Sequence, residues 1–237
     1  PFHVYGNLFV VDRIQEIADR HGLKVIYDAA HTFGEELDGR GVAELGDLSM
    51  FSFHATKVFH SIEGGAVSYR DPGLADRLYQ LKNFGIMNSE SVEYVGANGK
   101  MNEFQAAMGL CNLRHIDQEI AKRKRLADHY RKRLSNTEGI CLCSENPRVR
   151  SNYAYMPVVF DGYKKNRDQV FEELARADIH ARKYFYPCIN SYACYRGLFD
   201  EKETPVAARI SRQVLTLPLY AELDPEIVDR ICDLILV

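Results

Sequence analysis

The sequence predicts an α/β fold, and a few stretches near the N-terminus carry this prediction. Residues 1–6 are typical of the end of a strand followed by a turn. Residues 11–22 place apolar side chains at helical spacing and end in a glycine, as amphipathic helices do. Strand-like apolar runs follow at 23–27 and 48–53. A strand–helix–strand order of this kind indicates a sheet covered by helices.

Length and composition are those of an ordinary globular protein. The chain has 237 residues, 46% hydrophobic, with a formal net charge of −3. This length allows one or two domains with a sizeable core, and the charge does not favour nucleic acid or an acidic membrane surface as a partner. No apolar run approaches the roughly 20 residues of a membrane span. No signal peptide is visible, although the chain starts at Pro1 instead of methionine.

The six cysteines are scattered, and only Cys141 and Cys143 lie close together. A lone C-x-C has no second pair at zinc-site spacing, so we expect no metal. Scattered cysteines without a disulfide framework favour reduced thiols in a cytoplasmic protein.

The middle of the chain predicts helices around one polar loop. Asp71-Pro72 is typical of a helix start. The glycine-containing stretch 83–100 predicts a loop, which would be a lid, a contact with a partner subunit or a plain connection. Residues 102–134 are strongly helical, with a break near 112–115.

Two basic runs, 122–125 and 131–133, lie on the second of these helical segments. Clustered lysine and arginine can bind nucleic acid. Acidic residues flank both runs, however, and no aromatic residues are interleaved for base stacking. We therefore prefer a solvated helix face and expect no nucleic-acid partner.

The C-terminal half predicts an α+β arrangement of short elements. We expect strands at 153–160 and 180–186, helices at 167–177, 206–214 and 225–236 (the last after an Asp224 cap), and an extended segment at 215–219.

A single lysine, Lys57, stands in the loop between the strand at 48–53 and a further apolar run at 66–69. Burial disfavours the ammonium form, so a lysine between buried strands is costly unless it is used. One use is Schiff-base chemistry, in which a desolvated lysine of lowered pKa attacks a carbonyl. On position alone, a solvated surface lysine is the commoner explanation.

Asp28 stands at the carboxyl end of the strand at 23–27, where ligands bind in open α/β sheets. Because side chains alternate along a strand, Asp28 and Ala30 share a face. The carboxylate can keep a pyridine nitrogen protonated, while the alanine lets a flat ring lie close. An isolated aspartate is more often a turn or cap residue. Together with Lys57, however, it provides the pair that pyridoxal phosphate requires.

The segments that carry these residues resemble the DegT/DnrJ/EryC1/StrS family of sugar aminotransferases. The resemblance covers essentially the whole chain and is carried by VIYDAAHTFG (25–34), GDLSMFSFHATKVFHSIEGGAVSY (46–69), GANGKMNEFQAAMG (96–109) and YFYP (184–187).

The resemblance implies the fold-type-I architecture of pyridoxal-phosphate transferases. Residues 1–115 would form the C-terminal part of the cofactor-binding large domain, with a mainly parallel sheet and flanking helices. Residues 116–237 would form an interdomain helix and a smaller α+β domain.

The same resemblance implies roles for single residues. Lys57 would carry the cofactor and move the reacting proton, Asp28 would pair with the pyridine nitrogen, and Ala30 would pack under the ring. His31 would lie near the phenolic oxygen of the ring, and Ser52 would bind the cofactor phosphate. From the residues alone, His31 equally well makes local loop hydrogen bonds, and Ser52 belongs to the polar face of a half-exposed strand.

Three further residues are implied as contacts of the site. Asn98 would reach across a subunit interface to the neighbouring cofactor phosphate, which implies a homodimer with shared active sites. His54 and Tyr186 are candidates for substrate contacts, and a loop histidine and a packing tyrosine are equally good interpretations.

The function implied is transfer of an amino group, by analogy from glutamate, to a nucleotide-linked keto-deoxysugar. We favour a thymidine-diphosphate 4-keto-6-deoxyhexose aminated at C4, with a C3-amino product as the alternative. Lysine at position 57 argues against the dehydratase members, which carry histidine there. Relative to the family pattern the chain begins well inside the large domain, without the segment that supplies the phosphate cradle and an aromatic residue over the ring. A non-catalytic fragment or subunit is therefore the second hypothesis.

Overall fold

The computed structural model describes residues 1–8 and 10–237, which divide into two compact units. The first unit contains Pro1–Gln118 and Pro147–Asn152, and the second contains Glu119–Asn146 and Tyr153–Val237. The division expected between 115 and 116 lies close to this boundary. It did not include the short segment at 147–152, which returns to the first unit.

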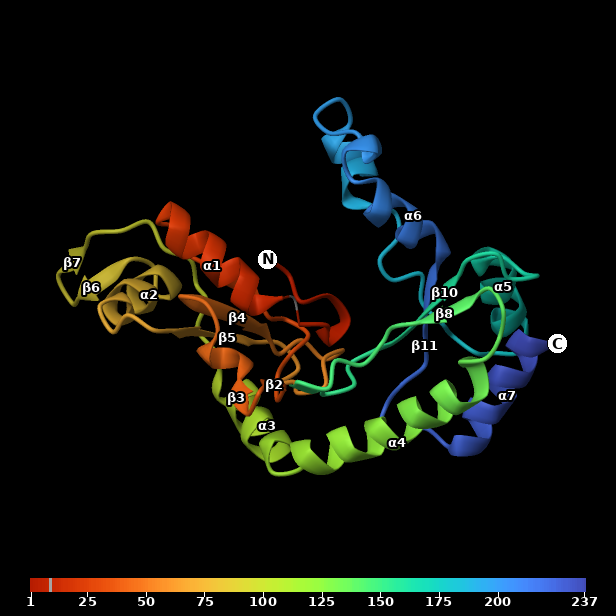
Figure 1. Cartoon of the computed structure of the whole chain (residues 1–237). Helices are drawn as coiled ribbons and strands as arrows, with labels where there is room; N and C mark the ends of the chain where they lie inside the picture. Colours follow the sequence, from red (N-terminus) through yellow and green to blue (C-terminus); the bar gives the residue numbers. More distant parts are fainter. Residues whose placement is uncertain (9) are drawn as a thin grey trace. The chain divides into compact units, whose positions relative to one another are not determined.

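A three-stranded sheet forms the centre of the first unit (Figure 1). Its order is β1 (Ile26–Asp28), β4 (Leu48–Ser52) and β5 (Gly65–Tyr69). Strands β1 and β4 are parallel, with Asp28 opposite Met50, and β5 runs antiparallel to β4. The carboxyl ends of β1 and β4 therefore lie next to one another.

One face of this sheet is buried, and the other face carries the side chains of the candidate site. Tyr27, Ser49 and Phe51 are buried on the first face. Because side chains alternate, Asp28 and Ser52 point to the opposite face. The core of the unit is built from Val11, Ala18, Val25, Tyr27, Ala29, Leu37, Val42, Leu45 and Phe51.

Helices and short strands complete the first unit. The helices are α1 (Val11–His21), α2 (Leu74–Lys82), α3 (Glu103–Leu113) and the 3₁₀ turns Val4–Gly6 and Val42–Glu44. A second sheet has the order β3 (Arg40–Gly41), β2 (Glu36–Leu37) and β9 (Val149–Arg150), and a hairpin joins β6 (Ile86–Asn88) to β7 (Ser91–Val92).

Local signals explain where two of these helices begin and end. Gly22 ends α1 in the left-handed conformation, with φ +62°, which glycine adopts without a Cβ penalty. Asn102 caps α3 in a reciprocal pair with Gln105, so the predicted break before α4 and the start of α3 are both confirmed.

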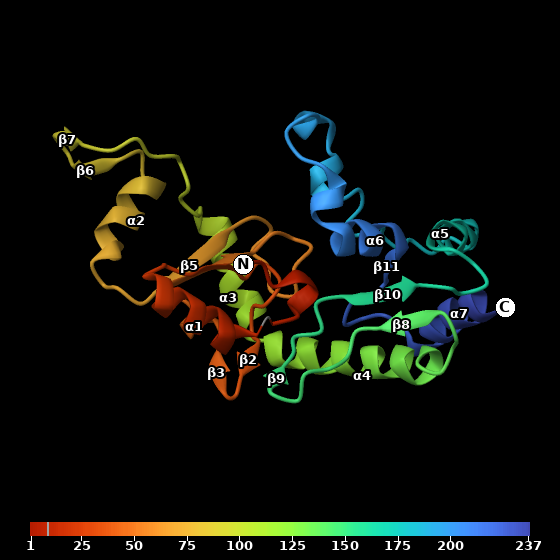
Figure 2. The ribbon, with the colours of Figure 1, turned by 45° about the horizontal axis from the view of Figure 1, so that its top comes forward.

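The second unit is an antiparallel sheet with helices packed on it (Figure 2). The sheet has the order β11 (Val214–Leu217), β10 (Met156–Phe160) and β8 (Ile140–Leu142). Its helices are α4 (Ile116–Leu134, of which Glu119 onward belongs to this unit), α5 (Arg167–Arg176), α6 (Pro205–Gln213), α7 (Pro225–Leu236) and the 3₁₀ turns Ile189–Ser191, Ala193–Tyr195 and Glu201–Glu203.

The apolar side chains of α4, α5 and α7 meet β10 and β11 in one core, which includes Tyr130, Leu134, Val158, Leu174, Leu215, Ile231 and Ile235. The basic residues of α4 serve this packing. Arg133 pairs with Asp229 and Asp233 of α7, and Lys122 pairs with Glu222. These pairs favour the interpretation of the basic runs as a solvated, ion-paired helix face.

Three predictions about elements were wrong. Residues 180–186 form no strand, because only Arg182 makes a bridge, to Thr216 of β11. The loop at 83–100 contains the β6–β7 hairpin, which its polar sequence does not indicate. Helix α2 begins at Leu74, and Asp71 instead accepts a hydrogen bond from the amide of Gly73 at 2.9 Å in the preceding turn.

Candidate active site

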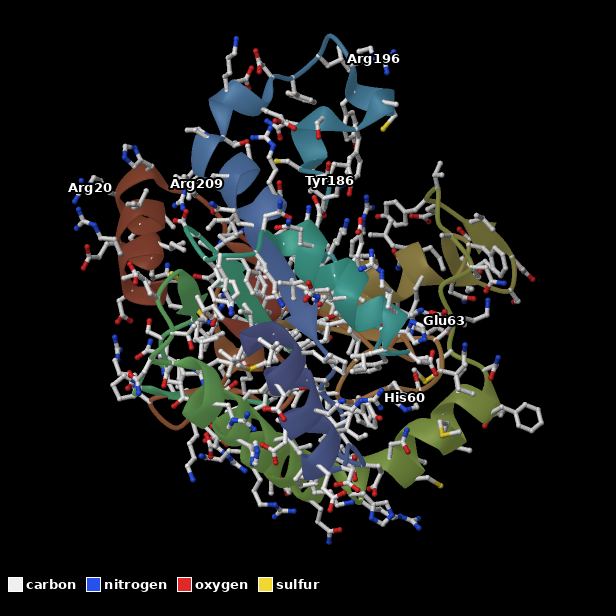
Figure 3. All side chains as sticks on the ribbon, turned by 90° about the vertical axis from the view of Figure 1, so that its right-hand side faces the viewer. Arg20, His60, Glu63, Tyr186, Arg196 and Arg209 are labelled. Atoms are coloured by element: carbon white, nitrogen blue, oxygen red, sulfur yellow. The ribbon has the colours of Figure 1, made fainter. Side chains whose placement is uncertain are left out.

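Lys57 lies on the loop between β4 and β5, and main-chain hydrogen bonds give this loop a defined shape. The amide of Lys57 donates to the carbonyl of His54 at 2.9 Å, and the amide of Ser61 donates to that of Phe53 at 3.0 Å. The loop also carries His60 and Glu63, whose side chains are labelled in Figure 3. The rings of Phe53 and Phe59 pack against one another on either side of Lys57 in the sequence, with their centroids 4.8 Å apart.

Lys57 lies within electrostatic range of Asp28 and His31. The side chain of Lys57 is half-buried. Burial lowers the pKa of its ammonium, and the Asp28 carboxylate opposes this effect by raising it. The positive charge of Lys57 in turn contributes to the lowered pKa of His31. The parallel pairing of β1 and β4 thus brings together the lysine, the carboxylate and the histidine that the sequence singled out.

His31 is a neutral imidazole with a defined tautomer. It is buried, and desolvation together with the charge of Lys57 lowers its pKa to about 3. Its Nδ1 accepts a hydrogen bond from the amide of Tyr5 at 3.0 Å. The proton of the neutral ring therefore resides on Nε2, which makes that nitrogen a donor.

Asp28, Ala30 and Ser52 stand at the two strand ends. One carboxylate oxygen of Asp28, Oδ1, accepts a hydrogen bond from the amide of Ala30 at 3.1 Å, which folds the chain back as it leaves β1. Ser52 is the last residue of β4, and its Oγ lies 3.4 Å from the amide of His54. All three side chains are partly exposed, so a bound molecule can reach them.

This arrangement suits a flat ring with a basic nitrogen, a carbonyl and an anionic group. Asp28 offers a carboxylate for a protonated ring nitrogen, and Lys57 offers an amine of lowered pKa for a carbonyl. His31 offers a fixed donor, and Ala30 leaves room for the ring. The residues present therefore fit pyridoxal phosphate.

The structure assigns His54 a local role. Its Nδ1 lies 2.8 Å from the hydroxyl of Thr56 and accepts the amide of Thr56 at 3.2 Å, and its Nε2 is 3.6 Å from a carboxylate oxygen of Glu63. His54 thereby stabilises the turn that precedes Lys57. A contact between His54 and a substrate stays a prediction.

Asn98 and Tyr186 are exposed, and each has a neighbour in its own unit. Lys100 donates to Oδ1 of Asn98 at 2.9 Å. The guanidinium of Arg167 lies 4.6 Å from the centroid of the Tyr186 ring, which Figure 3 labels. The roles in cofactor and substrate binding expected for Asn98 and Tyr186 stay predictions.

Two buried polar residues beside the site were not anticipated. Glu35 is 2% exposed, and its Oε1 accepts the hydroxyl of Ser151 and the amide of Asn152, both at 3.2 Å. Asn152 is 1% exposed and donates to the carbonyls of His31 and Phe33 at 2.8 and 3.0 Å. Nothing local marks either residue, because a glutamate in a polar turn and an asparagine between elements are ordinarily exposed.

Glu35 makes the stability of the chain depend on pH. Burial raises its pKa from an ordinary 4.5 to about 8. Between these two pKa values the folded chain holds a proton that the unfolded chain releases. The contribution of the protonated Glu35 to the free energy of unfolding is therefore complete below about pH 4.5 and is lost as the pH rises to about 8. The expected loss is at most about 5 kcal/mol.

Glu35→Gln should remove this dependence, because the amide keeps an oxygen for Ser151 and Asn152 and does not ionise. Denaturant unfolding at pH 5, 7 and 9 should show the variant gaining on the wild type as the pH rises, with a constant difference above pH 8. Glu36→Gln, which changes the partly exposed neighbour paired with Arg150, is the control. Parallel pH profiles for wild type and Glu35→Gln would contradict the assignment.

Neither a membrane helix nor a metal cluster is found in the part of the chain that the structure describes. Within residues 1–8 and 10–237, no helix is both long and apolar enough to cross a bilayer. The same residues contain no group of three or more histidine, cysteine, aspartate or glutamate side chains arranged to hold a metal ion.

Sequence comparison finds a family model and curated relatives that match nearly the whole chain. A model described as the DegT/DnrJ/EryC1/StrS aminotransferase family matches residues 1–236. Two curated relatives, both named dTDP-4-amino-4,6-dideoxy-D-glucose transaminase, are 39% identical over 98% of this chain in Shigella dysenteriae and 42% identical over 100% of it in Escherichia coli. These alignments cover 63% and 65% of the relatives, so the chain spans less than two thirds of their length.

Solved structures agree on the fold. S. venezuelae DesV superposes with a TM-score of 0.92 at 32% identity, over 99% of this chain and 63% of DesV. DesI, solved in the presence of its TDP-sugar product, gives a TM-score of 0.89 at 34% identity, over 99% of this chain and 60% of DesI.

Proposed function

The chain belongs to the DegT/DnrJ/EryC1/StrS aminotransferase family, and on this premise we propose that it forms the lysine-bearing part of a pyridoxal-phosphate-dependent sugar aminotransferase. The observation that carries the proposal is the meeting of Lys57, Asp28 and His31 at the adjoining carboxyl ends of β1 and β4. A lysine of lowered pKa beside a carboxylate, at the edge where α/β sheets bind ligands, is the pair that this cofactor needs.

Pyridoxal phosphate, when bound, supplies a ring that accepts electrons from the reacting carbon. Asp28 would pair with the protonated ring nitrogen. Lys57 would hold the cofactor through its amine, and the same amine is the group placed to move a proton at the reacting carbon. The burial that lowers the pKa of Lys57 increases the fraction of free amine available for both tasks.

The remaining residues orient the cofactor. Nε2–H of His31 is available to donate to an oxygen on the ring, and because the imidazole stays neutral at physiological pH it would do so without adding charge. The hydroxyl of Ser52 would bind the phosphate, and Ala30 would pack against the ring.

We infer that the substrate is a nucleotide-linked keto-deoxysugar and the amino donor glutamate. The names of the two transaminases at 39% and 42% identity support a thymidine-diphosphate sugar aminated at C4. The neighbouring subunit would contribute Asn98 in a homodimer. Support comes from Val95, Phe104 and Leu110, which lie within about 12 positions of Asn98 in the sequence. Their apolar side chains are 97%, 86% and 64% exposed and would be covered by a second copy.

The test is a titration of the purified chain with pyridoxal phosphate, followed by light scattering to determine its mass. We expect a dimer, a visible absorbance band from bound cofactor, and bleaching of that band by glutamate. Addition of the thymidine-diphosphate 4-keto-6-deoxyhexose should restore the band and yield the 4-amino sugar. A 3-amino product would correct the ring position, and a folded chain without any band would refute catalysis by this chain alone.

A further inference from the structure

We propose that Asn152 is a positioning residue of the active site, whose side-chain amide holds the loop at 29–33 so that His31 keeps one orientation beside Lys57. The inference rests on the proposed function where the cofactor is concerned. The placement of His31 itself can be measured without any cofactor.

The amide group of Asn152 bridges two carbonyls of the loop that leaves β1. Nδ2 donates to His31 at 2.8 Å and to Phe33 at 3.0 Å. An amide nitrogen has two protons, so one side chain satisfies both carbonyls. The bridged segment begins directly after Asp28, and its position therefore determines where the His31 ring lies relative to the strand end.

Asn152 is itself held in register from its own segment. Strand β9 pairs with β2 through the main chain, with Val149 opposite Leu37 and Arg150 opposite Glu36. Two residues further on, the amide of Asn152 donates to Oε1 of Glu35 at 3.2 Å. These contacts connect the returning segment to the end of the His31 loop at several points, which makes Asn152 a fixed support.

The ring of His31 is held by the N-terminal turn. Tyr5, in a left-handed conformation with φ +59°, points its amide at Nδ1 of His31. Gly6 follows with φ +87°, and a Cβ on it would lie 2.6 Å from Oε1 of Glu35, so only glycine fits there. His31 is thus held at its ring by Tyr5 and at its carbonyl by Asn152.

The test compares Asn152→Leu, which removes both donors at similar volume, with Arg150→Gln. The control changes the same segment by removing ion pairs to Glu36 and Asp117 but leaves the His31 loop untouched. The readout is ¹⁵N NMR of the histidine-labelled chain of residues 1–237 without cofactor, with the His31 signal assigned through its loss in His31→Gln.

In the wild type and in Arg150→Gln, His31 should remain neutral with its proton on Nε2 as the pH falls to about 4, because its pKa is about 3. In Asn152→Leu the loosened ring should become solvated, and its titration midpoint should rise by at least about one pH unit toward the ordinary value. The positive charge of Lys57, which contributes to the lowered pKa of His31, is present in all three proteins. An unchanged His31 signal in folded Asn152→Leu would overturn the proposal.

If Asn152→Leu does not fold, hydrogen exchange in the unmodified chain still tests the proposal. The side-chain amide protons of Asn152 should exchange with solvent far more slowly than those of the exposed Asn136. Equal exchange rates would contradict the bridge.

A cofactor measurement then separates this inference from the proposed function. Asn152→Leu should still attach pyridoxal phosphate at Lys57 after borohydride reduction, with a dissociation constant raised about tenfold, as His31→Leu should also show. The variant that combines Asn152→Leu with His31→Leu should bind the cofactor no more weakly than either single variant, because both substitutions act through the imidazole of His31. Failure of the wild type to attach the cofactor would refute the proposed function, while the NMR result would still decide the role of Asn152.

Discussion

Lys57→Ala should abolish covalent attachment of pyridoxal phosphate. Lys57 lies within electrostatic range of Asp28 and His31, and burial lowers the pKa of its ammonium, which increases the fraction of free amine that can attack a carbonyl. After incubation with the cofactor and borohydride reduction, intact mass spectrometry should show one added cofactor in the wild type and none in the variant. Amino transfer from glutamate should fall by at least about a thousandfold.

Lys100→Ala is the matched control. Lys100 lies in the same unit on an exposed segment, where its amine contacts Asn98 and the ring of Phe84. Its loss should leave the attachment at Lys57 intact. Peptide mapping of the reduced wild type completes the test, since a label on any other lysine would refute the assignment of Lys57.

Asp28→Asn should retain the attached cofactor but slow its reaction with glutamate by about 100-fold or more, the loss typical when a preorganised electrostatic partner is removed. The asparagine keeps the Oδ1 that accepts the amide of Ala30, so the turn after β1 should be preserved. It cannot hold a proton on the ring nitrogen by charge. The measurement is the rate of bleaching of the cofactor band by glutamate under single-turnover conditions.

The same substitution has a second expected effect, on Lys57. The Asp28 carboxylate raises the pKa of Lys57 against the effect of burial, so its removal should lower that pKa further. The pH dependence of the reaction of Lys57 with an amine-specific reagent would report the direction.

Asp71→Asn is the control for both effects, because Asp71 also accepts a main-chain amide two residues along the chain but lies in an exposed turn. Asp71→Asn should change neither the rate of reaction with glutamate nor the pKa of Lys57. Normal single-turnover rates in Asp28→Asn would refute the role of the carboxylate.

Regular elements were predictable where the local pattern is strong. Helices α1, α3 and α7 carry apolar side chains at helical spacing and have a cap or stop residue at an end, namely Gly22, Asn102 and Asp224. Strand β4 is an apolar run of the expected length. Such signals lie within a few residues of the element, so they can be read without knowledge of the fold.

Elements that exist only through distant pairing were not predictable. Strand β9 has two residues and is a strand only because the segment at 147–152 returns to the first unit and pairs with β2. Conversely, the stretch at 180–186 resembles a strand but makes a single bridge to β11. Sequence pattern shows that a segment can be extended, whereas the partner strand decides whether it is a strand.

Asp28 and Lys57 could be proposed as a pair from the sequence by itself, because each follows a short apolar strand, whereas His31 was added by the resemblance to a family. Only the tertiary structure decided that these groups meet, through the parallel pairing of β1 with β4. It also decided that Asn152, 121 positions beyond His31, supports their loop, and that Glu35 is buried with a raised pKa. Burial and pairing depend on which distant segments cover a residue, and no local pattern encodes that.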